Sequence, residues 1–186
     1  MSDHEWGFRT RALHAGAQPD PYSGARAVPI YQSTSFVFED TQDAADLFAL
    51  QKYGTIYTRI SNPTLAAFEE RVASLEGGIG AVATSSGQAA EFLTMAALAG
   101  EGDNIVANAS LYGGTVTQFD VTLRRFGIET RFVNTNDVAA VTTSIDDRTK
   151  AVFTEIIANP SGEVADLEAI SRITNADGVP LSLIHI

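Results

Sequence analysis

Cysteine is absent from this 186-residue chain, and histidine is scarce. Without cysteine the chain forms neither disulfides nor thiolate metal sites, and this composition is typical of a reducing compartment. The histidines, His4, His14 and His185, do not stand at the spacing of metal ligands, and none is placed for a serine–histidine–acid arrangement. We therefore expect neither a metal centre nor a serine-hydrolase triad.

Basic residues are also few, because 12 Lys and Arg stand against 23 Asp and Glu, which gives a net charge of −11 at pH 7. So acidic a chain offers no basic surface to replace the counterions of a nucleic acid or of an anionic membrane. No apolar run approaches the roughly 20 residues of a membrane span, and the polar start of the chain is unlike a signal peptide. We expect a cytoplasmic protein that binds neither nucleic acid nor membrane.

Residues 1–62 lack a sustained hydrophobic period and are interpreted as an N-terminal arm with one short helix. Residues 31–38 alternate small polar with aromatic and β-branched side chains, which favours an extended segment. Thr41 is suited to cap the one helix, which is expected to run to Leu50. The arm is too long and too apolar for a solvated tail, so we expect it to pack across another body, such as a second subunit.

From residue 63 onward, strand-like and helix-like segments alternate. Asn62 is a good N-cap and Pro63 a good first residue for the first of these helices. Strands are expected at 81–84, 104–107, 128–133 and 151–157, and helices at 63–76, 87–99, 113–126 and 166–175, with a short helix or loop at 138–145. This alternation is typical of an α/β fold with a mostly parallel sheet and helices on both faces.

The segment Ser85-Ser86-Gly87-Gln88 connects an expected strand to an expected helix. Such a turn presents free backbone N–H groups at the positive end of the helix dipole, where phosphate binds well. Taken alone, the turn could equally be a tight connection with no ligand. However, Tyr112 and Asn159 follow other expected strands, and ligands of parallel sheets bind at the carboxyl ends of the strands. Together the three segments predict a binding site at this edge of the sheet.

Several segments resemble, in their order and spacing, the Cys/Met-metabolism family of pyridoxal-phosphate (PLP) enzymes, which has fold type I. The residues that carry the resemblance are Phe8 to Gly16, Pro29 to Phe36, Tyr57-Thr58-Arg59, Ser61-Asn62-Pro63-Thr64, Ser85 to Ala90, Leu111 to Thr115, and Glu155 with Asn159-Pro160-Ser161-Gly162. The resemblance runs from about residue 8 to 181, nearly the whole chain. It implies PLP as the cofactor and residues 63–181 as the N-terminal part of the PLP-binding domain.

The resemblance assigns cofactor contacts to seven residues: Tyr57, Arg59, Ser86, Gly87, Gln88, Tyr112 and Asn159. It implies that residues 86–88 hold the cofactor phosphate, that Tyr112 stacks on the pyridine ring and takes part in catalysis, and that Asn159 lies beside the phenolic oxygen. Tyr57 and Arg59 are implied to reach the phosphate of a neighbouring subunit, and hence a homo-oligomer is implied. In isolation, each tyrosine could instead be a half-buried packing residue and Arg59 a surface charge.

Within this family, Gln88 and the run Tyr112-Gly113-Gly114-Thr115 are most similar to the O-acetylhomoserine sulfhydrylases. The implied reaction is a γ-replacement in which O-acetyl-L-homoserine and sulfide give L-homocysteine and acetate. Methionine γ-lyase and cystathionine γ-synthase or γ-lyase activities are the alternatives within the family. A non-catalytic phosphate-binding or subunit-interaction module is the alternative outside it.

Two departures from the family pattern concern the end of the chain. The family's aspartate that pairs with the pyridine nitrogen is expected a few residues after Leu181, where residues 182–186 have other side chains. The family's Schiff-base lysine is expected further on, and the only lysines, Lys52 and Lys150, stand in neither its motif nor its place. We therefore interpret the chain as an N-terminal fragment that is itself inactive, with residues 182–186 as a non-native tail.

Overall fold

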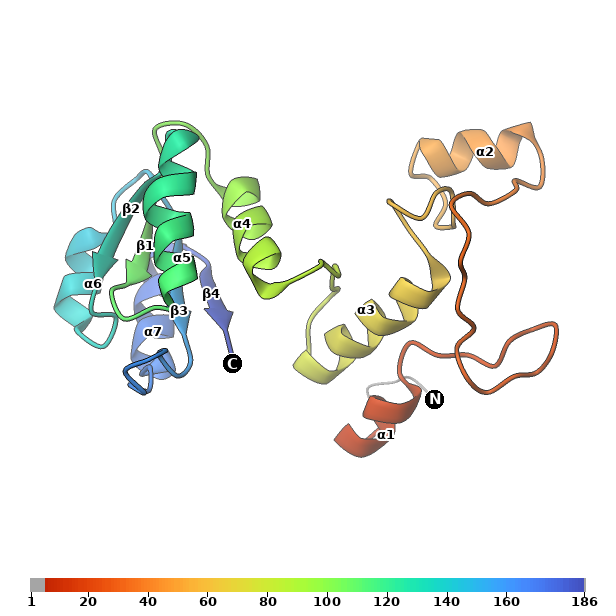
Figure 1. Cartoon of the computed structure of the whole chain (residues 1–186), viewed down its shortest axis with the longest axis horizontal. Coiled ribbons are helices and arrows are strands. Elements are labelled where there is room, and N and C mark those ends of the chain that lie inside the picture. Colours follow the sequence, from red (N-terminus) through yellow and green to blue (C-terminus); the bar gives the residue numbers. More distant parts are fainter. Residues whose placement is uncertain (1–5, 186) are drawn as a thin grey trace. The chain divides into compact units, whose positions relative to one another are not determined.

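The structure, a computed structural model, describes residues 6–185, so the predictions for His4 and for the polar start of the chain lie outside the described residues. Contacts divide the chain into two units, Met1–Ala83 and Thr84–Ile186. In Figure 1 the first unit is coloured from red to yellow and the second from green to blue. The helix that begins at Pro63 falls in the first unit. The division into an arm (1–62) and a PLP-binding domain (63–181) stays a prediction about function.

Within residues 6–83 the helices are α1 (Phe8–His14), α2 (Thr41–Phe48) and α3 (Pro63–Glu76). The Asn62 side chain caps α3 by accepting a hydrogen bond from the Thr64 N–H, and Pro63 fills the first helical position, where its missing N–H costs nothing. Gly77 ends the helix with φ 68°, a left-handed conformation that glycine adopts without strain. The prediction for this helix is confirmed.

Two details of the arm differ from the sequence-based expectation. The N-cap of α2 is Asp40, whose side chain accepts from the Asp43 N–H, so Thr41 is the first helical residue and the helix ends at Phe48. Helix α1 has seven residues, and its N-cap Gly7 makes no side-chain capping bond. So short a helix without a capping side chain carries little local signal, and its existence depends on packing.

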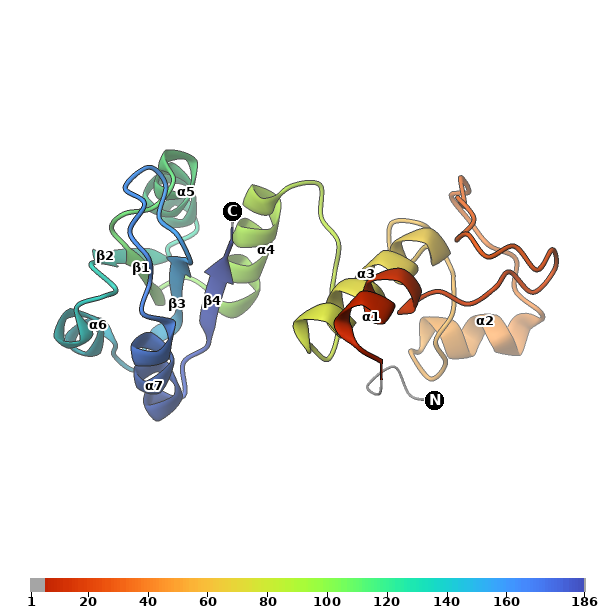
Figure 2. The same cartoon turned by 90° about the horizontal axis from the view of Figure 1, so that it is seen from below.

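That packing is supplied by α3, against which α1 lies (Figure 2). The Arg11 guanidinium donates to a carbonyl oxygen of α3, and Arg71 Nε donates to the Ala15 carbonyl oxygen at 3.0 Å. Gly16 passes so close to α3 that a Cβ there would come within 2.6 Å of the Ala67 carbonyl oxygen. The first helix is therefore fixed to α3 by hydrogen bonds and by close backbone contact.

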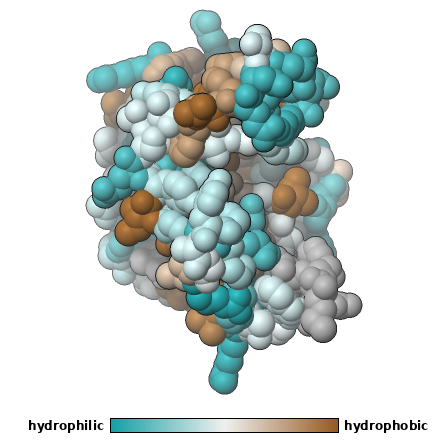
Figure 3. Space-filling view, turned by 90° about the vertical axis from the view of Figure 1, so that its right-hand side faces the viewer, coloured by the Kyte–Doolittle hydropathy of each residue, from teal (hydrophilic) through white to brown (hydrophobic). Residues whose placement is uncertain are grey.

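Apolar side chains remain exposed along the rest of the first unit. Val37 is 98% exposed and Ile79 is fully exposed, and Tyr53, Phe48 and Leu50 are largely exposed as well. Figure 3 shows such hydrophobic residues in brown, interspersed with hydrophilic residues in teal. The first unit thus leaves several large apolar side chains in contact with solvent.

The described part of the second unit is built on a four-stranded parallel sheet in the order β2-β1-β3-β4 (Figure 1). The strands are β1 (Asn104–Asn108), β2 (Glu129–Val133), β3 (Thr149–Glu155) and β4 (Leu181–Ile184). The helices are α4 (Gly87–Leu98), α5 (Gly113–Thr117), α6 (Val138–Ser144) and α7 (Leu167–Asp177). The predicted α/β fold with a mostly parallel sheet is confirmed.

Successive residues of β1 face opposite sides of the sheet and enter two apolar layers. Ile105 packs on the side of α4, where Phe119 and Phe153 meet edge to face with ring centroids 4.9 Å apart. Val106 packs on the other side, in one cluster with Ile170 of α7. All five side chains are at most 1% exposed. The helices thus cover both faces of the sheet and leave the strand ends to form a site.

The helix predicted over 113–126 is present but irregular. After α5 the chain forms a π-helical segment, η2 (Gln118–Leu123), in which the turn is wider than in an α-helix. This segment places both Phe119 and Leu123 in the core with no exposed surface. No helix within residues 6–185 is both long and apolar enough to cross a membrane.

One predicted strand is wrong, because residues 81–84 have no regular structure and Val82 is 85% exposed. A strand is stable only when a neighbouring strand supplies hydrogen-bond partners, and none of the described strands pairs with this segment. Conversely, Leu181–Ile184 forms β4, which pairs with β3 from Val152 to Glu155. That residues 182–186 are a non-native tail stays a prediction.

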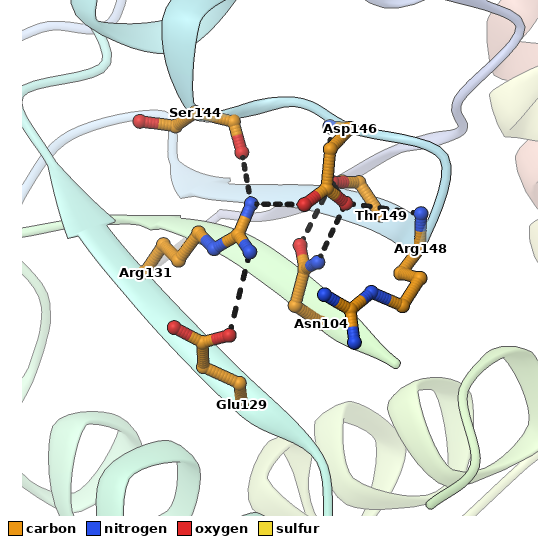
Figure 4. Close-up of polar contacts among 7 residues, drawn as sticks. All are labelled: Asn104, Glu129, Arg131, Ser144, Asp146, Arg148 and Thr149. Atoms are coloured by element: carbon orange, nitrogen blue, oxygen red, sulfur yellow. Dashed lines mark hydrogen bonds and ion pairs between the residues drawn. The ribbon is translucent and has the colours of Figure 1, made fainter. Parts of the chain in front are cut away.

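A polar cluster joins the amino ends of β1, β2 and β3 (Figure 4). Asp146 Oδ1 accepts a hydrogen bond from Asn104 Nδ2 at 2.9 Å, and Asp146 Oδ2 pairs with Arg131 Nη1, also at 2.9 Å. Thr149 Oγ1 donates to Asn104 Oδ1 at 2.7 Å, and Arg131 Nη2 lies 3.4 Å from a Glu129 carboxylate oxygen. The bond from Asn104, followed by that from Arg131, holds the pKa of Asp146 well below its ordinary value.

We expect Asp146→Asn to remove an acid-sensitive part of the stability. Because the folded chain lowers the pKa of Asp146, its contribution is fully present above the unfolded pKa of about 3.9 and is lost as the pH falls through the lower folded value. The variant should be less stable than the parent at neutral pH, and the difference should shrink on acidification. Urea denaturation followed by far-UV circular dichroism measures this difference.

The exposed neighbour Asp147 provides the matched control, since Asp147→Asn makes the same change of charge one residue away. It leaves the bonds of Asp146 to Asn104 and Arg131 in place, so its stability should stay close to that of the parent. A stability difference for Asp146→Asn that stays constant down to acidic pH would contradict the role assigned to this carboxylate.

Candidate functional site

The carboxyl ends of β1, β3 and β4 meet the start of α4 around a pocket of about 380 Å³. The residues that line it are Ser86, Gly87, Gln88, Glu91, Tyr112, Thr115, Glu155, Asn159, Ile184 and His185. All of them belong to the second unit. This is the edge of a parallel sheet at which ligands bind in open α/β folds.

The start of α4 supplies hydrogen-bond donors to this pocket. The Ser86 hydroxyl caps the helix by accepting from the Ala89 N–H at 3.1 Å. Among the described residues, the N–H groups of Gly87 and Gln88 have no acceptor. A Cβ on Gly87 would come within 3.3 Å of Ile184 Cδ1, so glycine keeps the approach to these N–H groups open. The residues present therefore fit an anion such as a phosphate group.

Tyr112 stands in the loop after β1 and forms another wall of the pocket. Its side chain is half exposed, and its ring folds over Gly114, where an added Cβ would lie only 2.5 Å from the ring. The Tyr112 N–H donates to Glu155 Oε1 at 2.8 Å. Both the ring and the backbone of this residue are thus held in place at the rim of the pocket.

Glu155 is the last residue of β3 and is 2% exposed. Its second carboxylate oxygen, Oε2, accepts from the Asn159 N–H at 2.8 Å. Each oxygen of this buried carboxylate therefore accepts a backbone N–H from a different loop. Because a charged acceptor makes strong hydrogen bonds in a buried site, these two contacts offset much of the cost of burying the charge.

A second buried carboxylate, that of Glu91, lies one turn into α4 and is 6% exposed. Its Oε2 accepts from Gln88 Nε2 at 3.2 Å and from Thr115 Oγ1 at 3.0 Å, and Gln88 Nε2 also donates to Thr115 Oγ1 at 3.0 Å. Burial raises the pKa of Glu91; the bond from Thr115 opposes this shift, and the charge of Glu155 adds to it. The network joins α4 to α5 in the wall of the pocket.

The structure brings together five of the seven residues assigned from the sequence: Ser86, Gly87, Gln88, Tyr112 and Asn159. The other two, Tyr57 and Arg59, belong to the first unit. The Arg59 guanidinium lies 5.7 Å from the centroid of the Tyr57 ring, and both side chains are exposed. Their role toward a neighbouring subunit's phosphate stays a prediction.

Five lining residues received no site role from the sequence: Glu91, Thr115, Glu155, Ile184 and His185. A signal for Glu91 was available, because residues three or four apart on a helix share a face and Glu91 stands three residues after Gln88. Glu155 was part of a segment that carries the family resemblance, but no contact or chemical task was assigned to it. Thr115 is far from Glu91 in sequence, and only the packing of α5 on α4 brings the two together.

A model of the Cys/Met metabolism PLP-dependent enzyme family matches residues 9–184. The chain belongs to this family. The resemblance read from its motifs is thereby confirmed, and PLP is the cofactor on which this family depends. The open N–H groups at the start of α4 fit the phosphate of PLP, because helix N-termini bind phosphate through such groups.

Individual relatives in this family match the chain over nearly its whole length. The homocysteine synthase of Schizosaccharomyces pombe is 51% identical over 174 residues, which make up 94% of this chain and 41% of that protein. The O-acetyl-L-homoserine sulfhydrylase of Corynebacterium glutamicum is 48% identical over 178 residues, or 95% of this chain and 41% of that protein. The chain spans about 40% of the length of the curated relatives it matches.

Solved structures share the fold of this chain. A Campylobacter jejuni protein described as an O-acetylhomoserine (thiol)-lyase, with a pyridoxyl-lysine monophosphate, matches with a TM-score of 0.92 and 38% identity; the match covers 96% of this chain and 44% of that one. The cystathionine γ-lyase of Lactobacillus plantarum, in complex with L-serine, matches with a TM-score of 0.85 and 32% identity, with the same coverage. The fold-type-I assignment is confirmed.

Neither lysine of the chain is among the residues that line the pocket. Lys52 is in the first unit and pairs with Asp43 at 2.6 Å. Lys150 stands near the start of β3 and pairs with Asp103 at 3.6 Å. Because the pocket lies where β3 ends, Lys150 is at the opposite end of that strand.

We expect Thr115→Val to destabilise the chain, because Glu91 then loses one of its two donors while remaining buried. An incompletely satisfied buried polar group costs about 1–3 kcal/mol of unfolding free energy. Thr115→Ser keeps the hydroxyl and removes one methyl group, so it should cost about 1 kcal/mol or less. Urea denaturation at pH 7 compares the two variants, and equal losses would contradict the importance of the hydroxyl.

Proposed function

We propose that the complete protein is a PLP-dependent sulfhydrylase that converts O-acetyl-L-homoserine and sulfide to L-homocysteine and acetate by γ-replacement. The observation that carries this proposal is the pocket itself, which is lined by Gly87 and Gln88, whose N–H groups have no acceptor among the described residues, and by Tyr112 and Asn159. The relatives from S. pombe and C. glutamicum, which bear the names of these activities, support the substrate assignment.

In this proposal the pocket residues divide the tasks of binding among them. The Gly87 and Gln88 N–H groups and the Ser86 turn bind the phosphate, Tyr112 covers the ring and assists proton transfer, and Asn159 lies beside the phenolic oxygen. Bound PLP supplies an electron sink for carbanions next to the ring, and the protein supplies orientation and electrostatics. Glu91 Oε2 and both oxygens of Glu155 accept hydrogen bonds from protein donors, which stabilise these carboxylates beside the proposed phosphate site.

Arg59 and Tyr57 are proposed to bind the phosphate held by a neighbouring subunit of a cytoplasmic homo-oligomer. An arginine suits this task because its planar guanidinium donates two parallel hydrogen bonds to phosphate oxygens. Both side chains are exposed, and so are many apolar side chains of the first unit. An assembly of subunits would cover those apolar side chains and bring Arg59 to a second pocket.

These 186 residues alone are proposed to be inactive. A Schiff-base lysine anchors PLP and acts as the principal base in this family, and neither Lys52 nor Lys150 lines the described pocket. The same observation favours the second candidate, a non-catalytic module that binds phosphate or a partner subunit. Methionine γ-lyase and cystathionine γ-synthase or γ-lyase chemistry are further alternatives, supported by the likeness to the L. plantarum enzyme.

A chimera separates these candidates. It joins residues 1–181 to the corresponding C-terminal part of the C. glutamicum sulfhydrylase, with that relative as the positive control. The proposal predicts homocysteine that forms only when both O-acetyl-L-homoserine and sulfide are present. Release of a keto acid without sulfide would favour a lyase, and a chimera that folds but does not bind PLP would favour the module.

In the same chimera we expect Arg59→Ala to weaken PLP binding at least tenfold, which corresponds to about 1.4 kcal/mol. The reason is the loss of two charge-assisted hydrogen bonds to the phosphate. Arg26→Ala, at another exposed arginine of the arm, removes the same charge and should leave the affinity unchanged. Titration followed by the absorbance of PLP measures both, and equal effects would contradict the role of Arg59.

A further inference from the structure

The carboxylate of Glu155 joins the two loops that carry Tyr112 and Asn159. We propose that Glu155 is a positioning residue, which sets the distance and orientation of these two residues around the cofactor pocket. This inference rests on the proposed function for its consequence in PLP binding. Its structural part, that one carboxylate fixes both loops, stands on the contacts of Glu155 alone.

The two loops follow neighbouring strands, but each begins with a hydrogen bond to a different edge of the sheet. After β1, the Ala109 N–H donates to Val133 of β2 at 2.7 Å. After β3, the Ile156 N–H donates to Ile184 of β4 at 3.0 Å. Since β2 and β4 are the two edges of the described sheet, the backbone bonds draw the loops apart. Glu155 connects them again.

The connection is symmetrical. Glu155 Oε1 accepts the Tyr112 N–H and Oε2 accepts the Asn159 N–H, each at 2.8 Å. The side chain reaches both because it stands at the last position of β3, between the loops, with 2% of its surface exposed. Fixing a backbone N–H fixes the residue that carries it, and so the position of each side chain at the pocket.

The same contacts argue against direct acid–base chemistry by Glu155. Each carboxylate oxygen already accepts one backbone donor, and only 2% of the side chain is exposed, whereas a general base must reach the proton it removes. Glu155 therefore acts through Tyr112 and Asn159. Its removal would also leave two N–H groups without their acceptor, so a loss of stability alone would not prove a positioning role.

Two substitutions separate the role of geometry from that of charge. Glu155→Gln keeps the shape and one acceptor oxygen, but its NH₂ group faces one of the two N–H donors, so one loop is released. Glu155→Asp keeps the charge and shortens the side chain by one methylene group, so that it cannot reach both loops at once. Glu168→Gln, at an exposed glutamate of α7, is the matched control.

The first measurement needs neither PLP nor activity. In the 186-residue chain, hydrogen exchange should show the Tyr112 and Asn159 amides protected like those of β1 and β3. In Glu155→Gln at least one of the two amides should exchange at least tenfold faster while β1 and β3 stay protected, and Glu168→Gln should change none. Rapid exchange of these two amides in the parent chain would overturn the inference even if the variants do not fold.

The second measurement uses the chimera with PLP. Both variants at Glu155 should weaken PLP affinity at least tenfold and change the visible circular dichroism of the bound cofactor, which reports its orientation. An unchanged spectrum and affinity, with only a lower melting temperature, would mean that Glu155 is merely structural and would overturn the inference. If the parent chimera does not bind PLP, the proposed function fails, whereas the exchange result for the two loops still decides the structural part.

Discussion

The parallel pairing of β1 with β3 is the constraint on which the pocket depends. It aligns Ala107 with Phe153, so both strands end at one level and their loops begin side by side. Tyr112 comes from one loop, and Asn159 from the other. The same register places Glu155 between the loops, where it can bond to both. A shift of one residue would turn Glu155 to the other face of the sheet.

The site combines a helix start that fits an anion with two buried carboxylates, in a chain whose net charge is −11. Such a site would repel a phosphate if the carboxylates faced it unpaired. Instead Glu155 bonds to backbone N–H groups, and Glu91 bonds to Gln88 and Thr115. Internal donors thus stabilise the two carboxylates, while the Gly87 and Gln88 N–H groups have no acceptor among the described residues.

Much of this arrangement can be predicted from local sequence. Asn62-Pro63 begins α3 by capping it, and Gly77 ends it by adopting the left-handed conformation. The turn at Ser86-Gly87 likewise predicts the start of a helix. The strand expected at 81–84 could not be judged in this way, because a strand needs a partner and local sequence does not identify one. Helix α1 was missed for a related reason, since its stability comes from packing on α3.

The residues of the pocket likewise differ in whether local sequence or only tertiary packing reveals them. Ser86, Gly87 and Gln88 are adjacent in sequence, so a single motif reveals them. Tyr112 and Asn159 could be placed because each follows a recognisable strand. Glu91 and Thr115 meet only through the packing of two helices, and no local pattern records that contact.

The π-helical segment Gln118–Leu123 has a consequence for the register of the helix that precedes it. Gln118 Nε2 donates to the Gln88 carbonyl oxygen at 3.0 Å, which holds this wide turn against α4. Each residue of an α-helix turns the chain by about 100°. Deleting one residue of the wide turn would rotate the helix before it by about 100° relative to the helix after it, so Thr115 and Leu123 would no longer both face their present partners. Chain length at this point therefore matters as much as the identity of the side chains.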